Sequence, residues 1–172
     1  TLDLVVMGAH LSKAFGETVN QIQLDGFEIS AKLDCLDPED SDIGMSRTIG
    51  TAVEKLTKVL SKLRPDMVLL IADRYEMLAT VQAALISQIP VAHIHGGELT
   101  IGAFDNAIRH AITKMSHIHF VAAQPYAQRV IQMGEIPQNV HIVGALGLDN
   151  INNMEFLSRE KLSKFFGIKI QS

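Results

Sequence analysis

Tryptophan is absent from the 172 residues, aromatic side chains make up only 5% of them, and Cys35 is the single cysteine. One cysteine excludes an internal disulfide framework and leaves a zinc site without companion thiolates, so we expect a reducing, cytoplasmic setting. The longest uninterrupted apolar run, residues 67–72, is far too short to span a bilayer, and no signal-peptide pattern is present. The sequence therefore indicates neither a disulfide-stapled secreted domain nor a membrane protein.

An excess of positive charge is also missing, because 15 lysines and arginines face 19 aspartates and glutamates and the net charge is −4. We therefore expect neither nucleic acid nor an anionic membrane as a partner. The chain contains no G-x-G-x-x-G fingerprint, no Walker A sequence and no H-E-x-x-H pair. Nothing in it supports a nicotinamide site, a P-loop or a zinc-protease site, and we expect no cofactor and no metal.

Short apolar segments alternate with amphipathic segments along the whole chain. Strands are predicted at residues 2–8, 28–33, 66–72, 90–95, 117–122 and 140–143, and helices at residues 12–24, 43–63, 76–88, 104–116, 125–133 and 158–166. The nearly all-apolar segment 66–72 predicts a parallel strand that is covered on both faces. Strands that alternate with helices imply βαβ units, so the expected fold class is α/β, a Rossmann-like doubly wound parallel sheet.

The densest polar cluster is His93-Ile-His-Gly-Gly-Glu98, followed by Asp105-Asn-Ala-Ile-Arg-His110. The first part stands at the end of a predicted strand, and the second part opens a predicted helix. Ligands bind at the carboxyl ends of strands in open α/β sheets, so solubility is a poor explanation for this cluster. Gly96 and Gly97 permit close approach of a ligand to the main chain, although an ordinary turn would use them too.

Three carboxylates fall where such a sheet binds its ligand. Asp73 follows the strand at 66–72, Glu98 lies past the glycine pair, and Asp105 falls in the first turn of the helix at 104–116. Each has an ordinary alternative: Asp73 as a helix cap, Glu98 as a solvated loop acid, and Asp105 as a capping acid paired with Arg109. Their convergence on one crevice favours a function in which several carboxylates act as general acids and bases.

Histidines and arginines lie close to these acids in the sequence. His93 and His95 alternate along a predicted strand and would face the same side, whereas His117 and His119 are interpreted as satisfied core or helix-end histidines. His10 follows the first strand and could reach the same crevice. The binding or supporting residues expected around the carboxylates are His10, Arg74, His95, Gly96, Gly97, Arg109 and His110.

Five segments together resemble the UDP-N-acetylglucosamine 2-epimerase family, in particular its hydrolysing branch that feeds sialic acid synthesis. They are Gly8-Ala-His-Leu-Ser12, Asp73-Arg-Tyr-Glu76, residues 93–98, residues 105–117 and Val143-Gly-Ala-Leu-Gly147. The resemblance implies the amino-terminal half of a two-domain fold like that of B-type glycosyltransferases. Residues 1–150 would form the Rossmann-like domain, and residues 151–172 an interdomain or C-terminal helical segment.

The same resemblance implies that two parts of the family's fold are absent from this sequence. One is the first strand, whose following loop carries an arginine near the nucleotide diphosphate; the other is the carboxyl-terminal UDP-binding domain with its catalytic histidine. Thr1 is not an initiator methionine, so we expect a piece of a longer protein that is inactive alone. Ala72 replaces a glycine common in the family, which is tolerable unless the backbone there needs a positive φ.

The resemblance further implies conversion of UDP-N-acetylglucosamine to N-acetylmannosamine and UDP, by elimination to 2-acetamidoglucal and hydration. Asp73, Glu98 and Asp105 match the family's three catalytic carboxylates, and Arg109 and His110 match the pair beside them. Asp105 as base or acid at C2, with Glu98 and Asp73 handling water and the opposite-face proton, is the working hypothesis. A UDP-sugar and a second copy of the chain are the expected partners.

Other functions stay open at this point. The substrate could be a UDP-2,4-diacetamido-trideoxyhexose, or the enzyme could be a non-hydrolysing UDP-N-acetylglucosamine 2-epimerase. A non-catalytic nucleotide-sugar binding domain would use the same residues for recognition alone. A retaining glycosyltransferase is compatible with the fold, because a fold does not settle a function.

Overall fold

The computed structural model describes residues 1–71 and 74–169, with the backbone alone at 152 and 153. Within these ranges the strands are all parallel and form two sheets, in the orders β1-β2 and β3-β4-β5-β6. The strands are β1 (Leu4–Met7), β2 (Ile29–Leu33), β3 (Val68–Ile71), β4 (Val91–Ile94), β5 (Ile118–Val121) and β6 (Val140–Ile142). The predicted alternation of strands and helices is confirmed.

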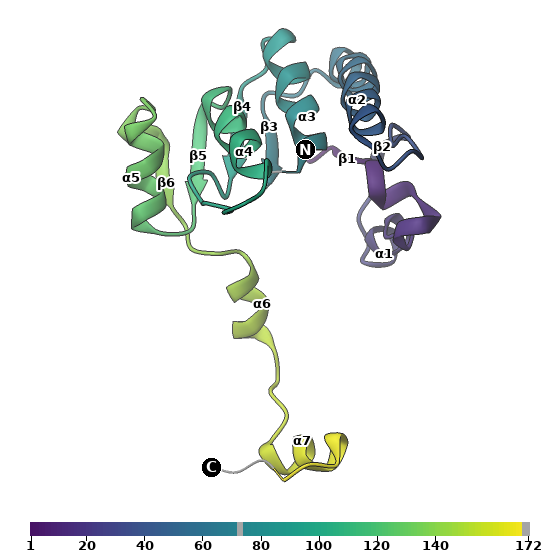
Figure 1. The fold of residues 1–172 in the computed structure, drawn as a ribbon, viewed down its shortest axis with the longest axis vertical. Helices are drawn as coiled ribbons and strands as arrows, with labels where there is room; N and C mark the ends of the chain where they lie inside the picture. The colour runs from purple at the N-terminus through teal and green to yellow at the C-terminus, as the bar shows by residue number, and fades with distance from the viewer. Residues whose placement is uncertain (72–73, 170–172) are drawn as a thin grey trace.

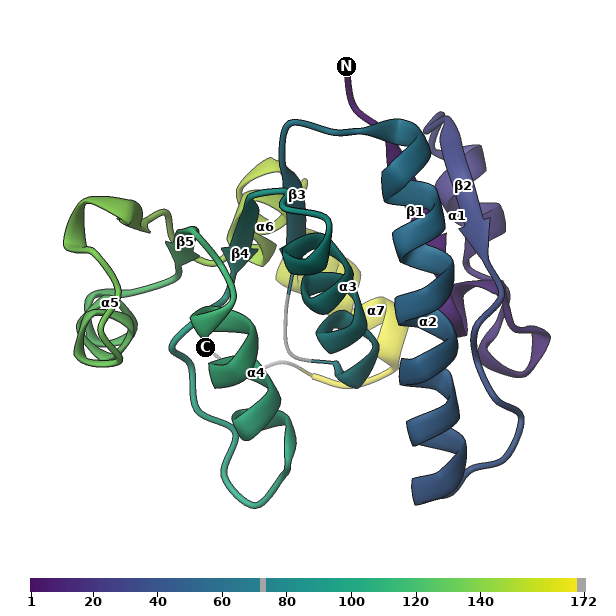
Figure 2. The same ribbon diagram turned by 90° about the horizontal axis from the view of Figure 1, so that it is seen from above.

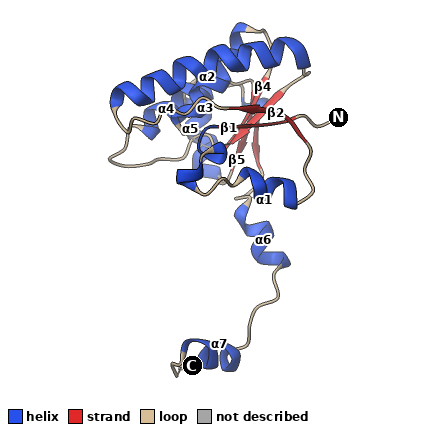
Figure 3. Cartoon of the chain, turned by 90° about the vertical axis from the view of Figure 1, so that its right-hand side faces the viewer, coloured by secondary structure: helices blue, strands red, loops and turns tan. Residues whose placement is uncertain are grey.

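The chain winds outward in two directions from the boundary between β1 and β3 (Figure 1). Figure 3 shows helix α2 above the strands and helix α1 below them, as the doubly wound Rossmann-like class requires. The helices are α1 (Val19–Leu24), α2 (Asp42–Leu63), α3 (Tyr75–Ile86), α4 (Asp105–Lys114), α5 (Gln124–Gln132), α6 (Gly147–Asn153) and α7 (Arg159–Phe166), with short 3-10 turns η1 (Gly8–Leu11), η2 (Lys13–Phe15) and η3 (Pro137–Asn139). Within the described ranges, no helix combines the length and apolar character needed to cross a membrane.

Helix α2 is set by its sequence at both ends and along one face. Ser41 Oγ accepts a hydrogen bond from Gly44 N (3.1 Å) at the start, and Arg64, just before Pro65, takes a left-handed conformation at the end. The buried residues recur every four positions, which gives one continuous stripe toward the sheet: Gly44, Thr48, Ala52, Leu56 and Leu60. Figure 2 shows this helix running beside α3, which packs against it.

Two local expectations are wrong. The predicted helix over 12–24 is broken into 3-10 turns before α1, because Gly16 (φ 84°) and Glu17 (φ 48°) are left-handed and cannot continue a right-handed helix. Strand β3 is covered on one face only. Leu70 belongs to the same buried cluster as residues of α2, α3 and α4, whereas Leu69 and Ile71 are 61% and 45% exposed on the other face.

Beyond β6 the chain leaves the domain as an extended arm made of α6 and α7 (Figure 1). Ser158 caps α7, as predicted, with its Oγ accepting a hydrogen bond from Lys161 N (3.3 Å). No residue of α7 is buried. The domain boundary at residue 150 stays a prediction.

Candidate active site

The loop after β4 bends sharply in its own backbone. His95 (φ 66°) and Gly97 (φ 78°) are both left-handed, while His95 N still donates a hydrogen bond to the Phe120 carbonyl (2.9 Å). A non-glycine residue held in this conformation costs about 1–3 kcal/mol and such strain gathers at functional sites. The bend turns the chain out of the strand and leads it directly to Glu98.

His95 and Glu98 hold one another across this bend. His95 Nδ1 donates to Glu98 Oε1 at 2.7 Å, and both side chains are about a quarter exposed. This bond fixes the carboxylate on the loop, and His95 Nε2 takes no part in it. The expectation that His93 and His95 share a face is wrong, because the left-handed His95 ends the strand alternation; His93 is buried against Thr113 of α4.

The glycine pair lets the loop pack tightly on the helices beneath it. A Cβ at Gly96 would lie 3.2 Å from both His93 Nδ1 and Thr113 Oγ1. A Cβ at Gly97 would lie only 2.5 Å from the carbonyl oxygen of Tyr126. Close packing is thus one reason for both glycines, and approach of a ligand to their main chain stays a prediction.

At the start of α3, the largely exposed Arg74 makes a two-pronged ion pair with the buried Glu76. Arg74 Nε and Nη2 donate to the two Glu76 oxygens at 3.1 and 2.8 Å, and Glu76 is 3% exposed. The hydrogen bond to Glu76 is the main cause that raises the pKa of Arg74, and the negative charge of Asp105 adds to it. Asp105, in the first turn of α4, therefore lies within electrostatic range of the residue that follows Asp73.

Glu76 and Arg129 were not among the residues expected from the sequence. Glu76 looks like an ordinary first-turn acid of a helix, and only the arginine two positions before it signals that it can be buried. Arg129 looks like an exposed position of an amphipathic helix, yet its Nη1 donates to the carbonyl oxygen of Gly97. Nothing in the local sequence of α5 indicates that contact.

Arg109 and His110 lie on α4, where Arg109 is 6% exposed. Burial lowers the pKa of His110, and the positive charges of Arg129 and Arg109 lower it further. His110 is therefore held toward its neutral form beside two guanidinium groups. The pairing of Asp105 with Arg109 stays a prediction.

The structure leaves part of the predicted constellation undecided. Asp73 lies outside the described residues, and a common hollow between Glu98 and Asp105 stays a prediction. His10 Nδ1 bonds Thr18 Oγ1 at 2.7 Å, and among the described residues no hydrogen bond or ion pair joins His10 to the β4 loop. Two surface hollows lie elsewhere, at the start of α2 and between α1 and β2.

The interpretation as satisfied histidines is confirmed for His117 and only in part for His119, whose buried Nδ1 has no hydrogen-bond partner among the described residues. His117 Nδ1 accepts a hydrogen bond from Val91 N (3.2 Å), and the fully buried His119 Nε2 lies 3.1 Å from Glu135 Oε2. Lys114 Nζ binds the other oxygen of Glu135. Burial is the main cause that lowers the pKa of His119, and Glu135 opposes it.

The lowered pKa of His119 predicts acid destabilisation. The unfolded chain, with an ordinary histidine pKa of 6.5, takes up this proton before the folded state does. The contribution of His119 is therefore fully present above pH 6.5 and is lost as pH falls from there toward the lower folded pKa. Urea unfolding between pH 8 and 5 should show a weaker slope with pH in His119→Gln than in the wild type. An unchanged slope in His119→Gln, or the same change in the exposed His141→Gln, contradicts this.

Comparison with known proteins gives the family. The protein-family model described as UDP-N-acetylglucosamine 2-epimerase matches residues 1–170 of the chain. The chain is 39% identical over 170 residues to GDP/UDP-N,N'-diacetylbacillosamine 2-epimerase (hydrolyzing) of Campylobacter jejuni. This match covers 99% of the present chain and 44% of that protein. It is 41% identical over 168 residues to UDP-N,N'-diacetylbacillosamine 2-epimerase (hydrolyzing) of Legionella pneumophila, with 96% and 44% covered. The chain thus spans less than half the length of these relatives.

A third relative and a solved structure come from the same organism. The UDP-N-acetylglucosamine 2-epimerase of Neisseria meningitidis serogroup B is 31% identical over 171 residues, with 99% of this chain and 44% of that protein covered. The crystal structure of UDP-GlcNAc 2-epimerase from Neisseria meningitidis bound to UDP-GlcNAc superposes with a TM-score of 0.75 at 20% identity, over 97% of this chain and 46% of that chain. This likeness shows the fold, the amino-terminal half of a two-domain protein. The chain belongs to the UDP-N-acetylglucosamine 2-epimerase family.

Proposed function

We propose that the full-length protein is a hydrolysing UDP-sugar 2-epimerase, which releases UDP and the 2-epimer of the sugar. The observation that carries the proposal is Glu98, fixed by His95 on a strained loop at the carboxyl end of β4. In an open parallel sheet this is the edge at which ligands bind. Asp105 opens the neighbouring helix α4, and Asp73 enters the proposal on its sequence position alone.

The reaction needs groups that move protons on both faces of the sugar. In the first step a carboxylate takes the C2 proton while the bond from C1 to the UDP oxygen breaks, which leaves 2-acetamidoglucal and UDP. In the second step water supplies a hydroxyl to C1, and C2 receives a proton on the opposite face. The sum is one water consumed, and no oxidant or reductant is involved. Negative charge near C1 stabilises the cationic character that develops there as UDP leaves.

Asp105 is the proposed base or acid at C2, with Glu98 and Asp73 handling the water and the opposite-face proton. Arg74 is placed to balance the charge of these acids, because it lies beside position 73 and within electrostatic range of Asp105. His95 orients Glu98 through its Nδ1 bond. Arg109 and His110 are proposed as supports, since both lie on the helix that Asp105 opens.

Two substrates are supported by different relatives. The proteins at 39% and 41% identity are named as N,N'-diacetylbacillosamine 2-epimerases, which favours a UDP-2,4-diacetamido sugar. The relative at 31% identity is named as a UDP-N-acetylglucosamine 2-epimerase, which supports UDP-N-acetylglucosamine as the second candidate. The sugars differ at C4 and C6, away from the reacting carbons, so the chemistry above serves both.

Turnover of the full-length protein on each nucleotide sugar tests the proposal. We expect release of free UDP together with a free 2-epimerised sugar, faster with the diacetamido substrate, followed by coupled UDP detection and NMR of the sugar. A UDP-linked epimer as the product would instead mark the non-hydrolysing reaction. Binding of both nucleotide sugars without formation of any product would instead indicate that the protein is a non-catalytic nucleotide-sugar binding protein.

The active site is proposed to need parts that this sequence does not hold. Strands β1 and β3 each pair on one side only within the described residues, and the apolar Leu69 and Ile71 are exposed. A parallel strand placed between β1 and β3 would join the two sheets into one. We propose that the full-length protein supplies this strand and a second, UDP-binding domain, and that the 172 residues alone give no turnover.

A further inference from the structure

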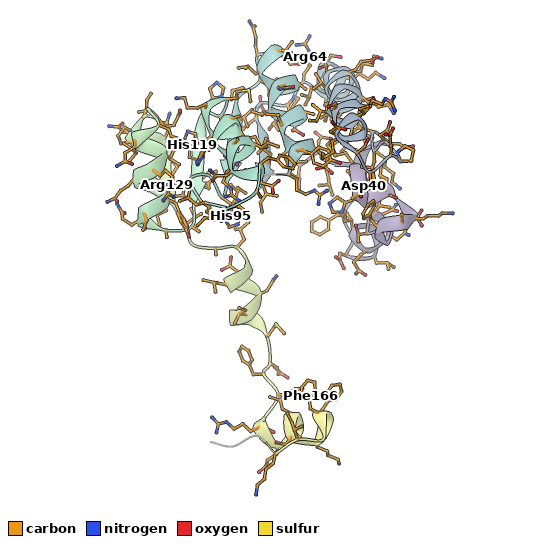
Figure 4. The ribbon with its side chains drawn as sticks, in the orientation of Figure 1. Asp40, Arg64, His95, His119, Arg129 and Phe166 are labelled. Carbon is orange, nitrogen blue, oxygen red and sulfur yellow. The ribbon has the colours of Figure 1, made fainter. Side chains whose placement is uncertain are left out.

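Arg129 lies on α5, outside the five sequence segments named above for the resemblance, and its side chain reaches the loop that carries Glu98. Its Nη1 donates a hydrogen bond to the carbonyl oxygen of Gly97, and its guanidinium carbon lies 5.9 Å from the centroid of the Tyr126 ring. Figure 4 shows Arg129 and His95 at the end of the domain from which the arm leaves. A guanidinium that is stacked over an aromatic ring is restricted in the directions its donors can take.

The loop rests directly on the same helix. The Cβ that Gly97 lacks would lie 2.5 Å from the Tyr126 carbonyl oxygen and 2.9 Å from Val130 Cγ2. Tyr126, Arg129 and Val130 are three and four residues apart, so they form one face of α5. On this face, Tyr126 and Val130 pack against the Cα of Gly97, and Arg129 donates a hydrogen bond to its carbonyl oxygen.

The hydrogen bond acts on the peptide that joins Gly97 to Glu98. Because a peptide group is planar, a fixed carbonyl oxygen also fixes the direction in which the chain enters Glu98. The Glu98 carboxylate is held at its other end by His95 Nδ1 (2.7 Å). Glu98 is thus fixed at its main chain by Arg129 and at its oxygen by His95.

We infer that Arg129 is a positioning residue of the epimerase reaction, which sets the orientation of Glu98 through the Gly97–Glu98 peptide. This inference rests on the proposed function. Arg129 acts through the main chain, so its loss affects the aligned reacting state more than substrate binding. A misplacement of 1 Å in a catalytic group costs about 100-fold in rate. Arg129→Met is therefore expected to lower kcat by about 100-fold and to leave KM nearly unchanged.

Steady-state kinetics of three variants of the full-length protein test the inference. Arg129→Lys keeps a donor for the Gly97 oxygen but loses the planar group over Tyr126, so its kcat should fall between those of the wild type and Arg129→Met. The control is Arg64→Met, the same change at the opposite end of the domain (Figure 4), which should leave kcat unchanged. A wild-type kcat in folded Arg129→Met overturns the inference. If Arg129→Met does not fold, a wild-type kcat in Arg129→Lys overturns it.

The pKa of His110 gives a second, independent readout, which reports where the positive charge of Arg129 lies. The charged groups that act on it are Arg129 from α5 and Arg109 from α4, and both lower its pKa in addition to burial. NMR titration should show a higher pKa of His110 in Arg129→Met and no change in Arg129→Lys or Arg64→Met. An unchanged pKa in Arg129→Met contradicts the placement of this charge. If the wild type turns over no UDP-sugar, the proposed function fails, while this titration still tests Arg129.

Discussion

Replacement of Glu98 by glutamine, or of Asp105 by asparagine, is expected to lower kcat of the full-length protein by about 10²–10⁴-fold, the usual contribution of a general acid or base. An amide keeps the size and most hydrogen bonds of a carboxylate but cannot take up a proton at neutral pH. Asp73→Asn belongs to the same series and tests a position outside the described residues. The measurement is the rate of UDP release under saturating nucleotide sugar.

The step at which each variant stops assigns the carboxylates. A variant that lacks the C2 base should release no UDP, because elimination cannot begin. A variant that lacks a group for hydration should release UDP once and accumulate 2-acetamidoglucal, which NMR detects. Asp66→Asn is the matched control, since Asp66 precedes β3 at the opposite end of the strand, and it should behave as the wild type. Full activity in all three carboxylate variants would show that they do not carry the chemistry.

The fold was predictable where the local pattern and the packing agree. Helix α2 has a serine cap, an apolar stripe at four-residue spacing and a proline after its last turn, so its bounds differ from the prediction by a single residue. The segment 12–24 has an apolar pattern too, but the pattern does not show that Gly16 and Glu17 adopt left-handed conformations. The exposure of one face of β3 was not predictable, because it depends on which elements lie over the sheet rather than on the strand itself.

The place of Glu98 in the loop after β4 and of Asp105 in the first turn of α4 was predictable from the sequence, whereas their gathering with Asp73 around one hollow stays a prediction. The bond between His95 and Glu98 joins two expected residues, yet the left-handed turn that brings them together contradicts the simple strand alternation. Arg129 was missed because it acts on a backbone oxygen 32 residues away in the chain, and a main-chain acceptor leaves no trace in a side-chain pattern. Buried Glu76 was missed because burial of a charge depends on its partner in space.

Gly97→Ala is expected to destabilise the protein by about 2–6 kcal/mol and to abolish most of its turnover. The left-handed backbone at φ 78° costs a non-glycine residue about 1–3 kcal/mol. The added Cβ would also lie 2.5 Å from a backbone oxygen of α5, which cannot rotate away, and overpacking of this kind costs about 1–3 kcal/mol. Urea unfolding of the full-length protein measures the first effect, and UDP release measures the second.

Gly26→Ala separates the two causes. Gly26 is left-handed as well, at φ 87°, but nothing lies within 4 Å of the Cβ it would gain. Its substitution should therefore carry only the backbone term, about 1–3 kcal/mol, and leave kcat intact. If both variants lose the same stability, the contact between the loop and α5 contributes nothing. If Gly97→Ala loses more stability and also loses kcat, the packing of Gly97 on α5 is what keeps Glu98 in its working position.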